Sequence, residues 1–346
     1  MTALLTHTPA EEALIAALQG ATGWRAQLRE ATREQGLPTK RNELWKWSDL
    51  RRAANDVSAA GELVVDGLEA AVLRPDDGAR LNLTLTAKPG ASAADAEITV
   101  PAGHAVTLVE HYRAEAGALG NWHLKITLEA GARLDRVCIA ADAPDGVFVS
   151  SAEIVLAPGA ALNQRTLDFG AKLSRIETHI THPGEGSQVD LGGVYLLDAK
   201  HHADTTTVVH HTGPGGQTRQ LVKGAAASHG HGVFQGKFIV DRAAQQTDAR
   251  MTHRALMLDD RAEIDAKPEL EIYADDVKCA HGATIGQLDE ISLFYLVSRG
   301  IGRRQANVLL TMAFINELVE QIPVEAVRET VQGRLNHFFE QTFQEA

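Results

Sequence analysis

The chain has 346 residues, and a hydrophobic content of 44% with only 5% aromatics can form an aliphatic core. Its formal net charge of −12 argues against a general nucleic-acid binder, because such proteins neutralise phosphates with basic patches. There is no apolar run of the roughly 18 residues that a membrane-spanning helix needs, no signal-peptide pattern, and only two cysteines. These features predict a cytoplasmic protein with reduced thiols that binds neither membrane nor nucleic acid.

The N-terminal region carries helix signals. Residues 8–36 are predicted as one helix, because Thr8-Pro9-Ala10-Glu11 has the spacing of a capping box and Gly36 is a stop signal. The polar segment 42–50 follows and contains two tryptophans. We interpret it as a surface clamp onto the next domain.

From about residue 80 to 275, short alternating strands dominate and a repeat appears. The segment 100–106 resembles 128–134 and 156–162, and a looser copy follows. The turn glycines of these copies are 28, 28 and 27 residues apart, at Gly103, Gly131, Gly159 and Gly186. Further copies are expected at 213–216 and, without glycine, at 258–264.

This near-constant period favours a parallel β-solenoid over the alternative, a β-sandwich of regular hairpins. A single repeat unit cannot bury its own apolar face, so successive units must stack. Stacking leaves unpaired strands at both ends, and such edges invite pairing with another chain. We expect the helical segments at both ends of the chain to cap the solenoid, and an edge strand to be available as a dimer interface.

The last part of the chain is helical. We predict a short helix at 293–298 that ends at Gly300, a second at 303–322 with one apolar stripe, and a third through Phe343. The changes in composition divide the chain into an N-terminal helical domain at 1–75, a parallel β-helix at 76–280 and a C-terminal helical domain at 281–346.

Cys279 and His281 are the most informative candidate site, since residues two apart share one face of an extended segment. A thiolate and an imidazole suit soft and borderline metals. An iron–sulfur cluster usually needs about four protein ligands, and the only other cysteine is Cys138 in an early repeat. A cluster on this chain would therefore be shared with another subunit or with small thiols. The simpler alternative is that both are ordinary residues at the end of a strand.

Histidines form a second candidate site, because imidazole binds Fe, Zn, Cu and Ni. Eight of the fifteen fall within about eighty residues: His201, His202, His210, His211, His229, His231, His253 and His281. They support an alternative function, a metal-dependent enzyme that uses the histidines from 201 to 253. The structural alternative is that they are solvated or hydrogen-bonded strand residues. The chain has no P-loop, so ATP hydrolysis by this chain is not expected.

Several motifs resemble one known family. They are Lys267–Ile272, Asp276–Thr284 with its Cys-x-His-Gly-Ala-Thr core, Leu293–Leu296 with Ser298–Ile301, and Trp45–Leu50. Together they resemble the SufB/SufD family of SUF iron–sulfur cluster assembly scaffolds. The SufD branch is the closer one, because the SufB branch carries a Glu-His-Glu-Ala-Thr type sequence where this chain has Cys279 to Thr284.

The resemblance implies a mainly β protein, a right-handed parallel β-helix flanked by N- and C-terminal α-helical domains. It implies a scaffold subunit rather than an enzyme, with a SufB-like paralogue and a SufC-like ABC ATPase as partners. His281, with Cys279, is implied to bind a transient Fe–S cluster at the interface, and reduced flavin is associated with some such complexes. The implied ATPase contacts are Leu293, Phe294, Tyr295, Ser298, Arg299 and Gly300. The isolated chain is a candidate homodimer. A further alternative function is a purely structural interaction module without metal chemistry, which only positions the SufB-like partner.

Overall fold

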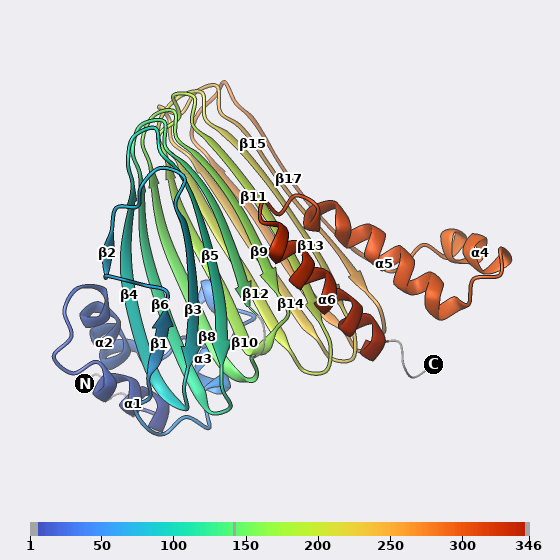
Figure 1. Cartoon of the computed structure of the whole chain (residues 1–346), viewed down its shortest axis with the longest axis horizontal. Coiled ribbons are helices and arrows are strands. Elements are labelled where there is room, and N and C mark those ends of the chain that lie inside the picture. Colours follow the sequence, from blue (N-terminus) through green and yellow to red (C-terminus); the bar gives the residue numbers. More distant parts are fainter. Residues whose placement is uncertain (1–5, 141–142, 343–346) are drawn as a thin grey trace.

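The computed structural model describes residues 6–140 and 143–342, and these form a parallel β-solenoid with helices from both ends of the chain packed on it (Figure 1). Successive strands alternate between two sheets, so that each coil adds one strand to each. The nine-stranded sheet has the order β1-β3-β5-β7-β9-β11-β13-β15-β17, and the eight-stranded sheet has the order β16-β14-β12-β10-β8-β6-β4-β2. Neighbouring strands are parallel throughout, except that β1 runs antiparallel to β3.

The strands of the nine-stranded sheet are β1 (Leu63–Asp66), β3 (Arg80–Ala87), β5 (Ala105–Ala114), β7 (Arg133–Ala140), β9 (Ala161–Asp168), β11 (Gln188–Leu197), β13 (Gln217–Ala226), β15 (Asp248–Met257) and β17 (Lys278–Gly286). Those of the eight-stranded sheet are β2 (Val72–Leu73), β4 (Gly90–Val100), β6 (Ala118–Leu128), β8 (Ala143–Leu156), β10 (Ala171–His182), β12 (His202–His211), β14 (His231–Val240) and β16 (Glu263–Ile272). The helices are α1 (Pro9–Ala17), α2 (Gly23–Gln35), the 3-10 turn η1 (Glu43–Trp45), α3 (Leu50–Ala53), α4 (Glu290–Ser298), α5 (Arg303–Val319) and α6 (Glu325–Thr342).

The sequence repeat is the coil of this solenoid. Its copies stack in register, with Leu128 paired to Leu156 in one sheet and Leu134 paired to Leu162 in the other. The turn glycine between them has a positive φ in each copy, for example +68° at Gly131, which residues with a Cβ adopt at a cost. The solenoid is therefore confirmed and the β-sandwich alternative is wrong.

The interior is aliphatic with a few buried charges. Leu83, Ile98 and Leu108 are among the leucines, isoleucines and valines that fill successive layers. The Arg136 guanidinium lies 2.6 Å from the Glu110 carboxylate, and both side chains are completely buried. A charge pair of this kind is stable inside a protein only while both partners are present.

The N-terminal helix is broken, contrary to the prediction of one helix at 8–36. The Thr8 capping box is present, but α1 ends at Ala17 and α2 starts at Gly23. Gly20 has φ +76° between them, a conformation that interrupts a right-handed helix. Gly36 ends α2 as predicted, with φ +74°.

The helices cover the faces of the sheets, whereas the sequence led us to expect them at the solenoid ends. Leu14 of α1 packs on Leu119 and Val147 from the eight-stranded sheet. On the other side, Ile315 of α5 and Leu335 of α6 pack on that part of the nine-stranded sheet where Val109, Val137 and Ile139 face outward. An amphipathic helix needs an apolar surface to bury its stripe, and these outer faces supply one.

The tryptophan segment is a clamp, as predicted. The Arg175 guanidinium on β10 lies 4.1 Å from the ring centroid of Trp45. The Ser48 hydroxyl is buried, donates to Asp204 and lies 2.9 Å from Nε2 of His202. This segment therefore fastens the N-terminal region to the outer face of the eight-stranded sheet.

The domain limits shift at both ends of the solenoid. Two short strands, β1 and β2, precede residue 76, and β17 continues past residue 280 to Gly286. The predicted helix at 303–322 is α5 followed by a turn, and its apolar stripe packs on the nine-stranded sheet. The predicted third helix is α6, whereas Phe343 lies outside the described residues.

Candidate functional site

Cys279 and His281 lie on β17, the last strand of the nine-stranded sheet. In the β15–β17 register, Cys279 is opposite Ala249 and His281 is opposite Met251. Ala249 and Met251 are buried in the solenoid core, so the two candidate ligands belong to the inward-facing rows. Among residues 6–140 and 143–342, β17 pairs in the sheet with β15 alone, so that His281 is exposed and Cys279 is half-buried.

The free edge of β17 can be assigned to particular residues. The Lys278 N–H donates to Thr247 on the β15 side, and backbone groups alternate in direction along a strand. The N–H groups of Cys279, His281 and Ala283 therefore face away from β15. The backbone of this edge is available for pairing at the same residues that could bind a metal.

Cys279 is held as a thiol by its surroundings. Burial raises its pKa most, a hydrogen bond from the Ala249 N–H opposes this, and the Asp248 carboxylate adds to the rise. Its sulfur side packs on the small apolar cluster of Val240, Ala244 and Ala274. A metal must displace the proton before the sulfur can bind it.

Cys138 does not take part in this site. It lies on β7, which is five strands from β17 in the sheet, or about 24 Å at the usual strand spacing. It is fully buried, burial raises its pKa to about 12, and it accepts a hydrogen bond from Tyr112 at 3.6 Å. The two thiols of the chain thus cannot bind one metal centre.

The predicted ATPase contacts lie on α4, which packs mainly on α5 and projects away from the sheets in Figure 1. Phe294 is 74% exposed and Tyr295 55%, with the Arg299 guanidinium 4.9 Å from the Tyr295 ring centroid. Gly300 ends the helix with φ +88°, as predicted, and the Ser298 hydroxyl donates to the Tyr295 carbonyl.

Leu293 differs from its neighbours, because only 3% of it is exposed. It stabilises α4 and is not available to a partner. Two residues that the sequence analysis did not select complete the exposed apolar surface, namely Ile291, which is 78% exposed, and Val297. Ile291 could have been found from the helical spacing of 291, 294, 295 and 298, whereas Val297 does not belong to that row.

The histidines from 201 to 253 do not gather into one centre. His229 has φ +70° in the turn before β14, so it does not share a strand face with His231. The other histidines have separate partners: His201 contacts Asp198, His202 meets His231 edge to face, His210 contacts Asp241, His211 stacks on His182, and His253 contacts Tyr195. A metalloenzyme built on this whole group has no support in this arrangement.

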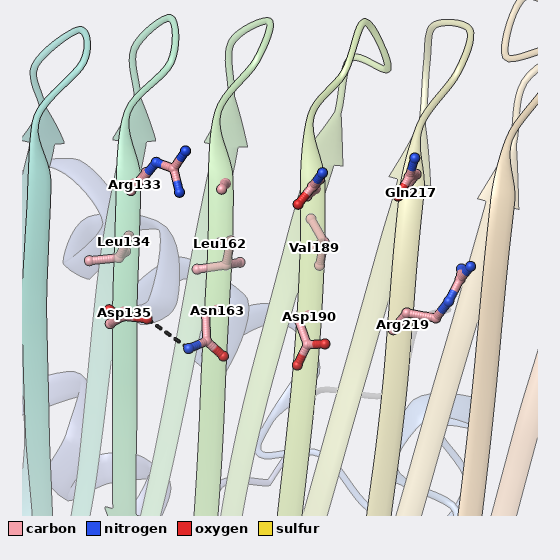
Figure 2. A pocket seen from close by; sticks show the side chains of 11 residues that line it. Arg133, Leu134, Asp135, Leu162, Asn163, Val189, Asp190, Gln217 and Arg219 are labelled. Carbon is pink, nitrogen blue, oxygen red and sulfur yellow. Dashed lines mark hydrogen bonds between the residues drawn. The ribbon is translucent and has the colours of Figure 1, made fainter. Parts of the chain in front are cut away.

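A polar groove of about 260 Å³ crosses β7, β9, β11 and β13 (Figure 2). Several of its polar side chains are paired with one another or with neighbours. Asn163 donates to Asp135 at 2.7 Å, as drawn in Figure 2, and Arg219 lies 2.8 Å from Asp248. The groove ends at β13, with β15 between it and β17, and is separate from the candidate ligands.

The comparisons with known proteins agree with this geometry. A family model described as SUF system FeS cluster assembly, SufBD core domain, matches residues 83–314. This chain belongs to the SufBD core family. The matched range includes β17 and α4, and hence both candidate sites.

Three relatives of the SufBD family show the extent of the similarity. The iron–sulfur cluster assembly protein SufD of Escherichia coli is 32% identical over 67% of this chain and 56% of its own length. The SufBD family protein slr0076 of Synechocystis is 37% identical over 61% of this chain and 46% of its own. The SufBD family protein ML0594 of Mycobacterium leprae is 29% identical over 87% of this chain and 76% of its own. The chain thus spans about half the length of the first two relatives.

Over residues 6–140 and 143–342, none of the helices is both long and apolar enough to cross a bilayer.

Proposed function

We propose that this chain is a SufD-like scaffold subunit, which pairs with a SufB-like paralogue and a SufC-like ABC ATPase. In this proposal it lends His281, with Cys279, to a transient iron–sulfur cluster at the subunit interface. The observation that carries it is the position of both ligands on an unpaired edge strand at the open end of the solenoid. The name of the E. coli relative, an iron–sulfur cluster assembly protein, supports the same function.

The number of donors supports a shared site. Cys279 and His281 supply two ligands, and a cluster usually needs about four. The second thiol is about 24 Å away, so the remaining ligands must come from outside this chain. A site completed only by two subunits opens when they separate, which suits a scaffold that passes its cluster on.

The open end also suits a partner that adds a strand. The exposed backbone of β17 can form main-chain hydrogen bonds to an edge strand of a SufB-like subunit. Such pairing would bring the partner's ligands next to His281. In the isolated chain the same edge is expected to support a homodimer.

We assign ATPase binding to the exposed surface of α4, made by Ile291, Phe294, Tyr295 and Val297. Aromatic side chains with this exposure are typical anchors of protein interfaces. ATP turnover would then act on the scaffold through α4 and α5.

The test is anaerobic reconstitution of the three-subunit complex, with cluster formation followed by absorbance. His281→Ala should abolish cluster build-up while the complex still elutes with all three subunits. His210→Ala removes an exposed histidine from β12 and should leave the yield unchanged. Normal cluster build-up with His281→Ala would overturn the ligand role, and failure of the complex to form with wild-type chain would overturn the scaffold role.

A further inference from the structure

Three side chains with metal-binding groups meet on the outer face of the eight-stranded sheet. His231 is the first residue of β14, and Glu263 and Asp265 lie on β16, the last strand of that sheet. Their donor atoms all lie within 4.8 Å of one another. Nε2 of His231 is 2.8 Å from Asp265 Oδ2 and 3.9 Å from Glu263 Oε1.

The imidazole of this group is fixed in position. The ring of His231 meets the ring of His202 edge to face, with centroids 4.6 Å apart. His202 is in turn held by Ser48 of the N-terminal clamp, at 2.9 Å.

The charges of the group are unbalanced. In the part of the chain that the structure describes, Glu263 and Asp265 make no ion pair with lysine or arginine, and His231 is their shared partner. A proton on the imidazole offsets one negative charge, whereas a divalent cation offsets both. Asp265 is half-buried, and a carboxylate in that position favours such compensation more than the exposed Glu263 does.

The distances also suit a metal. Zinc bonds to imidazole nitrogen and carboxylate oxygen are about 2.0–2.2 Å long, so two ligands of a tetrahedral ion lie about 3.4 Å apart. The separations between these donors bracket that value. Small rotations of two side chains would therefore complete three ligands and leave a fourth position for water.

We propose that His231, Glu263 and Asp265 bind one divalent first-row transition-metal ion. The ion links β16 to β14 beside the clamp and stabilises the last coil of the solenoid. The site is distinct from Cys279 and His281, which lie on the other sheet and include sulfur. The inference does not depend on the proposed scaffold function.

The test measures zinc binding to the full chain. Chelator-treated protein is dialysed against Zn²⁺, and bound metal is counted by mass spectrometry. We expect one equivalent that persists when Cys279→Ser and His281→Ala are combined. Glu263→Gln should weaken binding by more than about ten-fold, since even residues that only support metal ligands contribute that much. Glu263 is 69% exposed, so this variant is expected to fold.

The matched control is His210→Gln. His210 and Asp241 form a similar histidine–carboxylate pair at 2.9 Å on the same sheet, but the pair belongs to no such three-donor group in the described part of the chain. This variant should bind zinc as the wild type does. Cobalt substituted for zinc should give visible d–d bands without a thiolate charge-transfer band. The proposal is wrong if the wild type binds no metal, if Glu263→Gln binds it normally, or if the equivalent is lost with Cys279 and His281.

Discussion

At its N-terminal end the solenoid finishes with β1 and β2, which have four and two residues, whereas at its C-terminal end it finishes with β16 and β17, which have ten and nine. Proteins blunt exposed sheet edges by making the edge strands short or by covering them. The first end follows that rule, and β1 also reverses direction. The second end does not, and it carries Cys279 and His281. In the proposed function, the first end is completed by short strands of the chain itself, and the second is kept for a partner.

The largest effect is expected from blocking the open edge. The N–H of Ala283 faces away from β15, so Ala283→Pro removes a donor that a partner needs and leaves the β15–β17 hydrogen bonds intact. We expect complete loss of pairing with a SufB-like subunit, measured by gel filtration. The thermal midpoint of the isolated chain should change by no more than a few degrees.

The control for the blocked edge is Thr284→Pro, whose N–H lies on the β15 side of the strand. This variant should lower the thermal midpoint of the isolated chain, and it should also weaken pairing with the SufB-like subunit. If the Ala283→Pro variant still assembles normally, the partner does not pair with β17. The long edge strand at the C-terminal end would then have no role in assembly.

The second prediction concerns a buried ion pair in the N-terminal half of the solenoid. Glu110 on β5 lies 2.6 Å from Arg136 and accepts hydrogen bonds from Tyr112 and Trp122. Glu110→Gln leaves a buried guanidinium without its counter-charge, so the free energy of unfolding should fall by about 3–5 kcal/mol. Urea denaturation of the isolated chain measures it.

The control for Glu110 is Glu129→Gln, which disturbs a partly exposed pair with Arg74 at 2.9 Å. It should reduce the free energy of unfolding by less than about 1 kcal/mol. Equal losses for the two variants would show that the buried pair is no more important than a surface pair.

The third prediction is that acid destabilises the half next to the open end. His211 and His253 are fully buried, and burial lowers their pKa values to about 3 and about 4, with nearby His182 and His210 adding to the effect on His211. Unfolded histidine has a pKa near 6.5, so below that pH the unfolded state binds more protons and stability falls. Between pH 7 and pH 5.5 each should account for a loss of about 1 kcal/mol.

Hydrogen exchange at pH 7 and pH 5.5 would locate this loss. Exchange should rise in β12 to β15 before it rises in β3 to β7. Replacing both histidines by glutamine should flatten the dependence on pH. A pH dependence unchanged by that double substitution would assign the acid sensitivity to other groups.

The sequence predicted the solenoid because its physical requirement is local. A corner at every coil needs a residue with positive φ, and Gly131 and Gly159 mark two of these corners in the repeat. The sequence did not predict that each coil holds two long strands. The alternation of apolar and polar residues is the same in strands of either sheet, so it does not show which sheet a strand joins. The break after α1 was missed because Gly20 in a helical pattern is compatible with helix as well as turn.

For the candidate site, the sequence pointed to Cys279 and His281. It also indicated that a cluster there would need ligands from another subunit or from small thiols. The sequence could not show that β17 is the last strand of its sheet. A strand is last when no further strand pairs with it, and this pairing is visible only in the structure. The group of His231, Glu263 and Asp265 was also hidden, because it depends on the register between β14 and β16, which are separated along the chain.

The smallest effect is expected at α4, which lies outside the solenoid. Phe294→Ser removes an exposed aromatic side chain, so it should weaken binding of a SufC-like ATPase by more than about ten-fold, as loss of an interface anchor does. Binding is measured by titration calorimetry with the purified ATPase. The matched variant is Leu309→Ser on α5, which is 42% exposed and should bind normally. Pairing through β17 should be unaffected by Phe294→Ser, since α4 and the open edge are separate surfaces. If Phe294→Ser binds the ATPase normally, the exposed surface of α4 is not the ATPase-binding surface.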